Sequence, residues 1–248
     1  MQISDTASFK LITMRHEEKF FCSSRDLFLL EARLRAVLPY DSYQTGSGYQ
    51  IRSLYLDTFD DRLYRESLYG IEKRHKYRIR FYNMNDSFFR FERKDTIGHL
   101  KQKQSAPLAK KQVEELMRGN GFIRDGVQDD GHALLQEAYS LQQTEGLRPV
   151  AIVDYHRTAF TYPHGNIRIT LDRDISCTHR VEGFLDPNAL LYPLLPKNKH
   201  VLEVKYDGCL PGYITSILNL AGLEQISFSK YASARNVIMS NGRCEEDY

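Results

Sequence analysis

Residues 76–94 read KYRIRFYNMNDSFFRFERK, in which charged and apolar residues alternate on both sides of a short polar stretch. Before that stretch Arg78 and Arg80 alternate with aromatic and aliphatic residues, and after it the alternation returns in FRFERK. Successive side chains of a β-strand point to opposite faces of the sheet. The stretch therefore predicts a β-hairpin with its turn at 83–87, one apolar face and one charged face.

Two environments suit the charged face of this hairpin. Half-buried strands commonly turn their polar face to water, which would make Arg78 and Arg80 solvent-facing. In the alternative, the charged face points into the lumen of a β-barrel and the apolar face packs beneath helices. Arg90, Glu92 and Lys94 continue the charged face on the second strand.

Strand and helix patterns extend over the rest of the chain. Strands are predicted at residues 11–22, 50–57, 100–105, 149–162, 167–177 and 200–207, in addition to the hairpin. Helices are predicted at 25–38 with Ser24 as N-cap, at 61–69 as a short helix or turn, and at 108–118, 133–143 and 211–221. This order predicts an α+β fold, and about eight strands can close into a barrel. We expect one domain, residues 1–248, with a helical insertion at about 106–146 and a loose polar tail at about 237–248.

The composition excludes several classes of protein. The chain has 248 residues and a net charge of +2, which argues against a general nucleic-acid binder. No apolar run approaches the ~18 residues of a membrane span, while a peripheral membrane partner stays open. Four cysteines without a CxxC pair, and a start that does not resemble a secretory signal, predict a cytoplasmic protein. The oligomeric state stays open.

Many charges fall on the strand face that would point inward. The cations are Arg15, Lys19, Arg78, Arg80, Arg90, Lys94, Lys103, Arg157, Arg168 and Lys205. The carboxylates are Glu17, Glu92, Asp172 and Glu203, with Asp174 predicted on the face of Asp172. A phosphate chain would offset the cost of gathering so many cations, because Arg and Lys bind phosphate oxygens through charge-assisted hydrogen bonds. A carboxylate among cations suits a hard divalent metal that bridges phosphates.

Eight short motifs occur in a fixed order along the chain. They are RHEEKF (15–20), SLYLDT (53–58), YRIRFY (77–82), FERK (91–94), VDYHRTAF (153–160), IRITLDRDI (167–175), LEVKYDG (202–208) and SKY (229–231). In order and spacing this set resembles the triphosphate tunnel metalloenzymes of the CYTH-like superfamily. Within them it is most similar to the polyphosphate polymerase domain of the VTC (vacuolar transporter chaperone) type. Each motif alone is common, and the ordered set is the specific signal.

The resemblance implies a closed antiparallel eight-stranded β-barrel with flanking helices, through which phosphates are threaded. The phosphate-binding residues that it implies are Lys19, Arg78, Arg80, Lys94, Lys103, Arg157, Arg168, Lys205 and Lys230. It implies Glu203 and Glu17 as ligands of a divalent metal, Mn or Mg. The catalytic residues that it implies are Arg78, Arg80, Lys205 and Glu203.

The chain departs from the family pattern in two respects. Tunnel enzymes that cleave small triphosphates commonly begin with ExExK, whereas here the corresponding residues are Arg15, Glu17 and Lys19, which leaves fewer acids for a second metal. The eukaryotic polymerase also carries an inositol-phosphate-sensing domain and membrane spans. This sequence shows neither, so we expect a freestanding protein of the bacterial type.

The implied activity is a transferase reaction in which the γ-phosphoryl group of ATP extends a polyphosphate chain. If water attacks instead, the same site is a hydrolase of inorganic triphosphate or nucleoside triphosphates. A third possibility is a polyphosphate-binding module without catalysis. Glu203 also has a simpler interpretation, as an ion-pair partner of Lys205. Glu92 and Asp172 can orient neighbouring arginines, or Asp172 can be a second metal ligand.

Overall fold

The computed structural model describes residues 15–44, 46–98, 100–121, 132–219 and 222–245. The predicted first strand begins at Arg15, and its residues 11–14 lie outside the described residues. Residues 122–131, in the acidic stretch between the two middle helices, also lie outside them.

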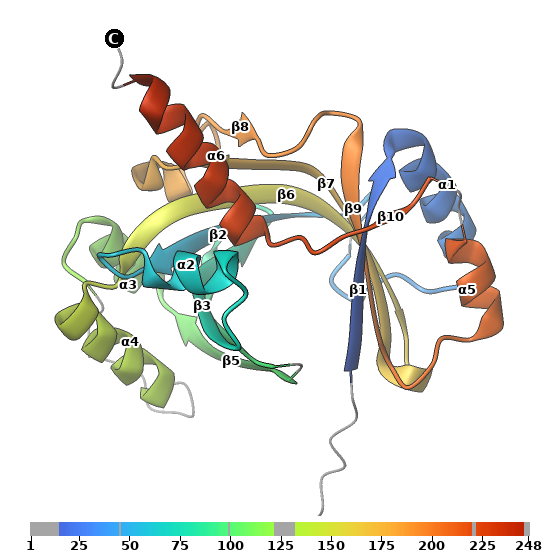
Figure 1. The fold of residues 1–248 in the computed structure, drawn as a ribbon, viewed down its shortest axis with the longest axis horizontal. Helices are drawn as coiled ribbons and strands as arrows, with labels where there is room; N and C mark the ends of the chain where they lie inside the picture. The colour runs from blue at the N-terminus through green and yellow to red at the C-terminus, as the bar shows by residue number, and fades with distance from the viewer. Residues whose placement is uncertain (1–14, 45, 99, 122–131, 220–221, 246–248) are drawn as a thin grey trace, which may run out of the picture.

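One antiparallel sheet of ten strands forms the centre of the molecule (Figure 1). The long strands are β1 (Arg15–Ser23), β2 (Tyr49–Asp57), β3 (Lys73–Tyr82), β4 (Asn85–Ile97), β5 (Leu100–Leu108), β6 (Arg148–Tyr162), β7 (Ile167–Thr178) and β9 (Lys199–Asp207). The other two strands, β8 (Tyr192–Pro193) and β10 (Glu224–Gln225), have two residues each. The strand order is β10-β1-β9-β7-β6-β2-β3-β4-β5, with β8 paired to β7.

The sheet is strongly curved but not closed by backbone hydrogen bonds (Figure 1). Its order has two ends, and no ladder joins β5 to β1 within the described ranges. The expected closed eight-stranded barrel is therefore wrong as a description of the hydrogen bonding. The reason lies partly at β1, where β10 pairs with Phe20 and Phe21 and thereby occupies the edge that would otherwise meet β5. The N–H of Ile226 also donates to the carbonyl of Lys19.

Six α-helices flank the sheet in the described part of the chain. They are α1 (Ser24–Arg35), α2 (Arg62–Leu68), α3 (Lys110–Met117), α4 (His132–Glu145), α5 (Gly212–Leu218) and α6 (Lys230–Glu245). None of these helices has the length and apolarity needed to cross a bilayer. The N-cap of α1 is Ser23 rather than Ser24, because the Ser23 hydroxyl accepts from the N–H of Asp26 in a capping box. The predicted polar tail at about 237–248 is helical through Glu245, where α6 ends.

The hairpin of β3 and β4 has the two faces predicted from its alternation. Ile79, Phe81, Phe89 and Phe91 are fully buried in one apolar cluster with α3 and α4, on the outer side of the sheet. The turn is tighter than predicted, because only the two residues 83–84 lie between the strands, both with positive φ. Arg78 and Arg80 lie on the opposite, concave face.

A second outer cluster lies at the other end of the curved sheet (Figure 1). Leu27, Leu30 and Leu34 of α1 pack with Ile169 and Leu202, so the apolar face of the helix covers β7 and β9. The helical spacing of these leucines was the basis for predicting α1. Helices thus cover the outer face of the sheet at both ends.

α6 lies on the concave face, over its apolar part. Tyr231 of α6 stacks on Tyr55 with ring centroids 5.0 Å apart, in a cluster that also contains Tyr155 and Val201. The Tyr231 hydroxyl donates to Asp57, a fully buried carboxylate. The C-terminal helix is therefore fixed to the inner side of β2.

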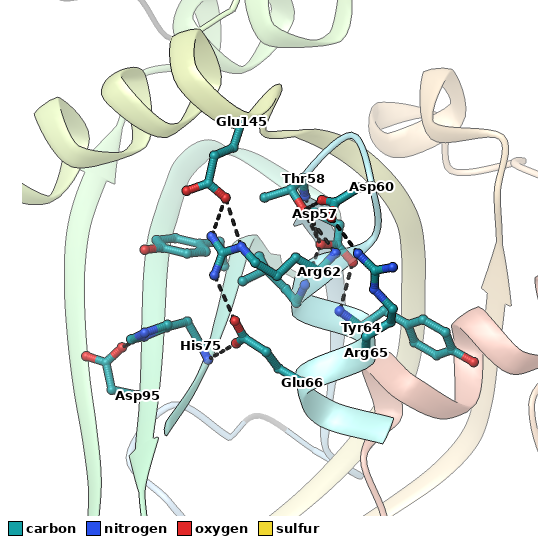
Figure 2. Close-up of polar contacts among 12 residues, drawn as sticks. Asp57, Thr58, Asp60, Arg62, Tyr64, Arg65, Glu66, His75, Asp95 and Glu145 are labelled. Carbon is teal, nitrogen blue, oxygen red and sulfur yellow. Dashed lines mark hydrogen bonds and ion pairs between the residues drawn. The ribbon is translucent and has the colours of Figure 1, made fainter. Parts of the chain in front are cut away.

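Polar contacts join α2 to its surroundings (Figure 2). Asp57 accepts the backbone N–H groups of Leu63 and Tyr64 at 2.9 and 3.0 Å, and so satisfies orphan donors at the start of α2. Arg62 donates to Glu145 of α4 at 2.8 Å and to Glu66 at 2.7 Å. These bonds hold α2 between β2 and α4.

One ion pair lies in the outer core. Arg52 of β2, 2% exposed, donates through Nε to Asp154 of β6 at 2.6 Å. Its Nη1 donates to the carbonyl of Asp186 at 2.5 Å, just beyond the short helix η2 (Val181–Leu185). The guanidinium thereby ties this connecting segment to the sheet.

Replacing Asp154 tests this pair. Asp154→Ala should lower the free energy of unfolding by about 3–5 kcal/mol, because it leaves the buried Arg52 without counter-charge. Urea unfolding followed by circular dichroism measures the change. The matched control Asp86→Ala breaks a solvent-exposed pair with Lys110 and should change stability far less. Equal effects of the two substitutions would contradict the structural role given to Arg52.

Candidate functional site

The concave face carries a network of charges, which we call the cationic cluster. Its cations are Lys19, Lys76, Arg78, Arg80, Lys94, Lys101, Lys103, Arg157, Lys205 and Lys230, and its carboxylates are Glu17, Glu92, Asp172 and Glu203. Arg80 is buried, and Arg78 has 22% of its side chain exposed. The solvent-facing interpretation of the hairpin therefore does not hold.

Glu92 is the carboxylate between the two hairpin arginines. It accepts from Arg78 and from Lys103, both at 2.7 Å, and lies 3.7 Å from Arg80. Burial acts to raise the pKa of Glu92, but these three cations together hold its pKa well below the ordinary value. Glu92 is thus ionised and holds both arginines in place.

Glu17 forms ion pairs across the open seam of the sheet, the gap between β1 and β5 that no backbone hydrogen bonds close. Its carboxylate on β1 lies 3.5 Å from Lys94 of β4, 3.1 Å from Lys101 of β5 and 3.3 Å from Lys19 of its own strand. Burial acts to raise the pKa of Glu17, but Lys94, Lys205 and Lys19 outweigh it and lower the pKa to about 2. Ion pairs therefore join the two ends of the sheet where the backbone does not.

Asp172 of β7 holds the third group of cations. Arg157 of β6 donates to both of its oxygens, at 2.6 and 2.8 Å, and Lys230 of α6 donates at 2.6 Å. The carboxylate is fully buried, and these two partners keep its pKa below the ordinary value in spite of burial. Asp172 thus orients Arg157 and brings the SKY lysine of α6 into the cluster.

Glu203 is the fourth carboxylate. It is buried, forms an ion pair with Lys205 two residues along β9, and faces Lys19 on β1 in the strand register. Burial acts to raise the pKa of Glu203, but Lys205 and Lys19 set it well below the ordinary value. Glu17 is opposite Lys205 in the same register, so the two carboxylates are diagonal neighbours on adjacent strands, and the charge of Glu203 acts to raise the pKa of Glu17.

The family model of the VTC domain matches residues 14–239. The chain belongs to the VTC domain family. No curated protein sequence matches the chain.

The solved structures to which this VTC domain is similar have low sequence identity to it. A putative adenylate cyclase from Bacillus halodurans has a TM-score of 0.49 and 15% identity over 83% of this chain and 87% of its own. A putative adenylate cyclase from Vibrio parahaemolyticus has a TM-score of 0.45 and 14% identity over 90% of this chain and 99% of its own. The mimivirus capping enzyme triphosphatase has a TM-score of 0.38 and 12% identity over 83% of this chain and 87% of its own.

The donor set of the VTC domain suits one kind of metal binding. The described ranges hold no group of three or more His, Cys, Asp or Glu side chains that could form an all-protein cage. Glu17 and Glu203, on neighbouring strands, are two carboxylates facing the same cations. Mg²⁺ is commonly bound by one or two carboxylates together with substrate phosphates. The pair therefore fits a metal whose other ligands are phosphate oxygens and water.

Three predicted residues have other surroundings than expected. Arg168 lies opposite Lys205 in register, but its guanidinium binds Asp41 and, at 3.0 Å, the Tyr49 hydroxyl. Arg90 is exposed. Asp174 is exposed at a β-bulge with φ +54°, so its predicted place beside Asp172 is wrong.

Two lysines of the cluster had not been assigned a role from the sequence. Lys101 shares a face with Lys103, and its contact with Glu17 shows that both point inward. Lys76 donates to the Ser229 hydroxyl at 2.9 Å. Lys76 precedes Arg78 by two residues, so the alternation that placed Arg78 on the inner face could also have placed Lys76 there.

Lys76 is a cation in unfavourable surroundings. Burial lowers its pKa, and the charges of Lys94 and Lys19 lower it further, to about 7. Lys94 is affected in the same way, since burial lowers its pKa to about 8 although Glu17 opposes the shift. The inner face thus holds more positive charge than its carboxylates neutralise.

Removing Lys76 should stabilise the protein. A folded-state pKa below the unfolded value of about 10.4 means that the penalty is fully present below pH 7 and disappears as pH rises toward that value. Lys76→Met should therefore raise the free energy of unfolding by about 1–3 kcal/mol at pH 6, and by much less at pH 10. Denaturant unfolding at both pH values measures the effect. Lys111→Met, at an exposed position of α3, is the control and should show no such pH dependence; the same response in both variants would contradict the assignment.

Proposed function

We propose that this VTC domain is a polyphosphate polymerase, which transfers the γ-phosphoryl group of ATP to a growing polyphosphate chain. The observation that carries the proposal is the excess of ten cations over four carboxylates on one concave face. A polyanion supplies the missing negative charge, and membership of the VTC domain family supports phosphate as that anion.

Roles follow from position in the cluster. Arg78 and Arg80, fixed by Glu92, would bind the reacting triphosphate, and Lys205 of β9 would be the third catalytic cation. The chain of phosphates would contact Lys19, Lys94, Lys103, Arg157 and Lys230 of the cluster, and also Arg168, which lies opposite Lys205 in register. Partial exposure of Lys103 (53%), Lys94 (35%) and Lys205 (28%) gives solutes access to these groups.

The proposed tunnel is closed by side chains. The eight long strands would surround the phosphate chain, and Glu17 with Lys94 and Lys101 would complete the wall between β1 and β5. Phosphate oxygens entering this region would compete with Glu17 for the same lysines. The wall would therefore adjust to the bound chain without breaking any backbone ladder.

The chemistry needs little covalent participation from the protein. A terminal oxygen of the acceptor chain attacks the γ-phosphorus of ATP, the bond from that phosphorus to the β,γ-bridging oxygen breaks, and ADP leaves. Arg78, Arg80 and Lys205 align the phosphates and offset the charge that develops, which is where most catalysis of phosphoryl transfer arises. A divalent cation on Glu203 and Glu17, Mn or Mg, would add charge neutralisation at the phosphate oxygens when bound.

Incubation of the protein with ATP and Mn²⁺ tests the proposal. We expect long, acid-labile phosphate chains together with ADP. Release of ADP and inorganic phosphate without polymer would show that water is the acceptor and that the domain is a triphosphatase. Binding of tripolyphosphate without any turnover would indicate a binding module.

Glu203→Gln separates catalysis from binding. The substitution should lower metal-dependent turnover by about 100-fold or more, and tripolyphosphate affinity should change little or increase because a negative charge is lost. Turnover and calorimetric affinity are measured on the same preparation. Glu182→Gln, at an exposed site on η2, is the matched control. Unchanged turnover in Glu203→Gln would contradict the role given to this carboxylate.

Binding of a phosphate chain should take up protons. An anion favours the charged form of a lysine, so it should raise the pKa of Lys76 from about 7 and of Lys94 from about 8. At pH 8 tripolyphosphate binding should therefore take up about one proton, and at pH 6, where both lysines are already charged, close to none. Calorimetry in buffers of different ionisation enthalpy measures the uptake. Equal uptake at the two pH values would contradict this linkage.

A further inference from the structure

The charged face of the β3–β4 hairpin extends beyond the cationic cluster. Arg90 of β4 lies directly opposite Arg80 of β3 in the strand register. The Arg90 guanidinium lies over the ring of Phe88, 5.1 Å from its centroid. Phe89 and Phe91 are buried on the outer side, so Arg90 shares the inner face of Glu92 and its contact places Phe88 there too.

Phe88 and Arg90 are both available to a ligand. Phe88 has an exposed fraction of 45%, whereas Phe89 and Phe91 on the same strand are fully buried. Within the described part of the chain no carboxylate lies within ion-pair distance of Arg90. Arg78, Arg80 and Lys103, by contrast, all lie near Glu92. A single exposed Phe is ordinary on a protein surface. Here, however, an unpaired guanidinium lies against it, beside the arginines assigned to the triphosphate.

An aromatic ring next to a guanidinium is a stacking surface for a nucleobase. Bases stack on Phe, Tyr and Arg side chains largely without regard to sequence, because every base has a π-face. Phe88 lies two residues before Arg90, at most about 7 Å along the strand, in the stretch of β4 where the register with β3 shifts. A ribose and the inner phosphates of a nucleotide can extend over this distance when the terminal phosphate is at Arg78 and Arg80.

We propose that Phe88 and Arg90 form the nucleobase site of the donor, and that they make a nucleoside triphosphate a better ligand than inorganic tripolyphosphate. This inference rests on the proposed function, since it places the terminal phosphate of the nucleotide at the hairpin arginines. Arg90 contacts the inner phosphates or the base plane, and Phe88 stacks on the base. The polyphosphate product has no base, so it leaves this surface free for the next donor.

Phe88→Ala tests the site through the difference between two ligands. Dissociation constants of ATP and of tripolyphosphate are measured by calorimetry for the wild type, Phe88→Ala and Phe88→Trp. In Phe88→Ala the affinity for ATP should fall by about 5- to 100-fold, whereas the affinity for tripolyphosphate should stay within about twofold. Phe88→Trp should retain the affinity for ATP, because its ring still stacks. In Phe88→Ala the affinities for GTP and CTP should fall as the affinity for ATP does.

Phe28→Ala is the matched control. Phe28 lies on α1, is 71% exposed and is far from the hairpin in the sequence, so its loss should change neither affinity. An equal loss of both ligands in Phe88→Ala, or no loss of either, would overturn the nucleobase site while leaving the phosphate site intact. Wild-type binding of tripolyphosphate but not of ATP would overturn it as well. Wild-type binding of neither ligand would overturn both this inference and the proposed function.

Discussion

Unbalanced positive charge on the concave face is the constraint on which this structure depends. Each buried ion costs several kcal/mol unless a counter-charge and hydrogen bonds compensate for it. Four carboxylates supply that compensation, and three of them each hold two or three cations. Most of these pairs join different strands, and those of Glu17 with Lys94 and Lys101 join β1 to β4 and β5, so the cluster exists only in the folded sheet. Positive charge still exceeds negative charge on this face, and burial together with neighbouring lysines lowers the pKa values of Lys76 and Lys94.

The fold tolerates this excess because a large apolar cluster lies on the outer face, opposite the charges. On β3 and β4 the outward residues join an apolar cluster beneath α3 and α4, and the inward residues form the cationic cluster. α6 contributes to both, since Tyr231 packs on Tyr55 and Lys230 reaches Asp172. The hydrophobic stability of the outer face is therefore largely independent of the charges within, and substitutions in the cluster can change binding without removing the core.

Local alternation made much of this arrangement predictable. The two faces of the hairpin, the strand carrying Glu203 and Lys205, and the leucine face of α1 all follow from periodicities of two or 3.6 residues. Partners between distant segments were not predictable in the same way. Nothing near Arg168 in sequence indicates Asp41, and nothing in the motif containing Glu17 indicates that it meets Lys101 across a seam. The bulge at Asp174 and the helical continuation of α6 were also missed, because one depends on the pairing of β6 with β7 and the other on packing against the inner face.

The four carboxylates would keep the proposed phosphate site ordered before phosphate arrives. Without them the arginines and lysines would repel one another and would not keep one geometry; with them, every cation of the cluster except Lys76 already lies near a carboxylate oxygen. A phosphate chain presents oxygens of the same kind, so binding exchanges one set of partners for another with little rearrangement of the strands. Glu92 and Asp172 are buried and pair with arginines, so they are suited to keep those arginines in place while phosphate binds. Glu17 and Glu203 are held by lysines, whose flexible ammonium groups can move to a phosphate and leave both carboxylates free for a divalent cation. The same charges would thus organise the free protein and, after one exchange of partners, the bound one.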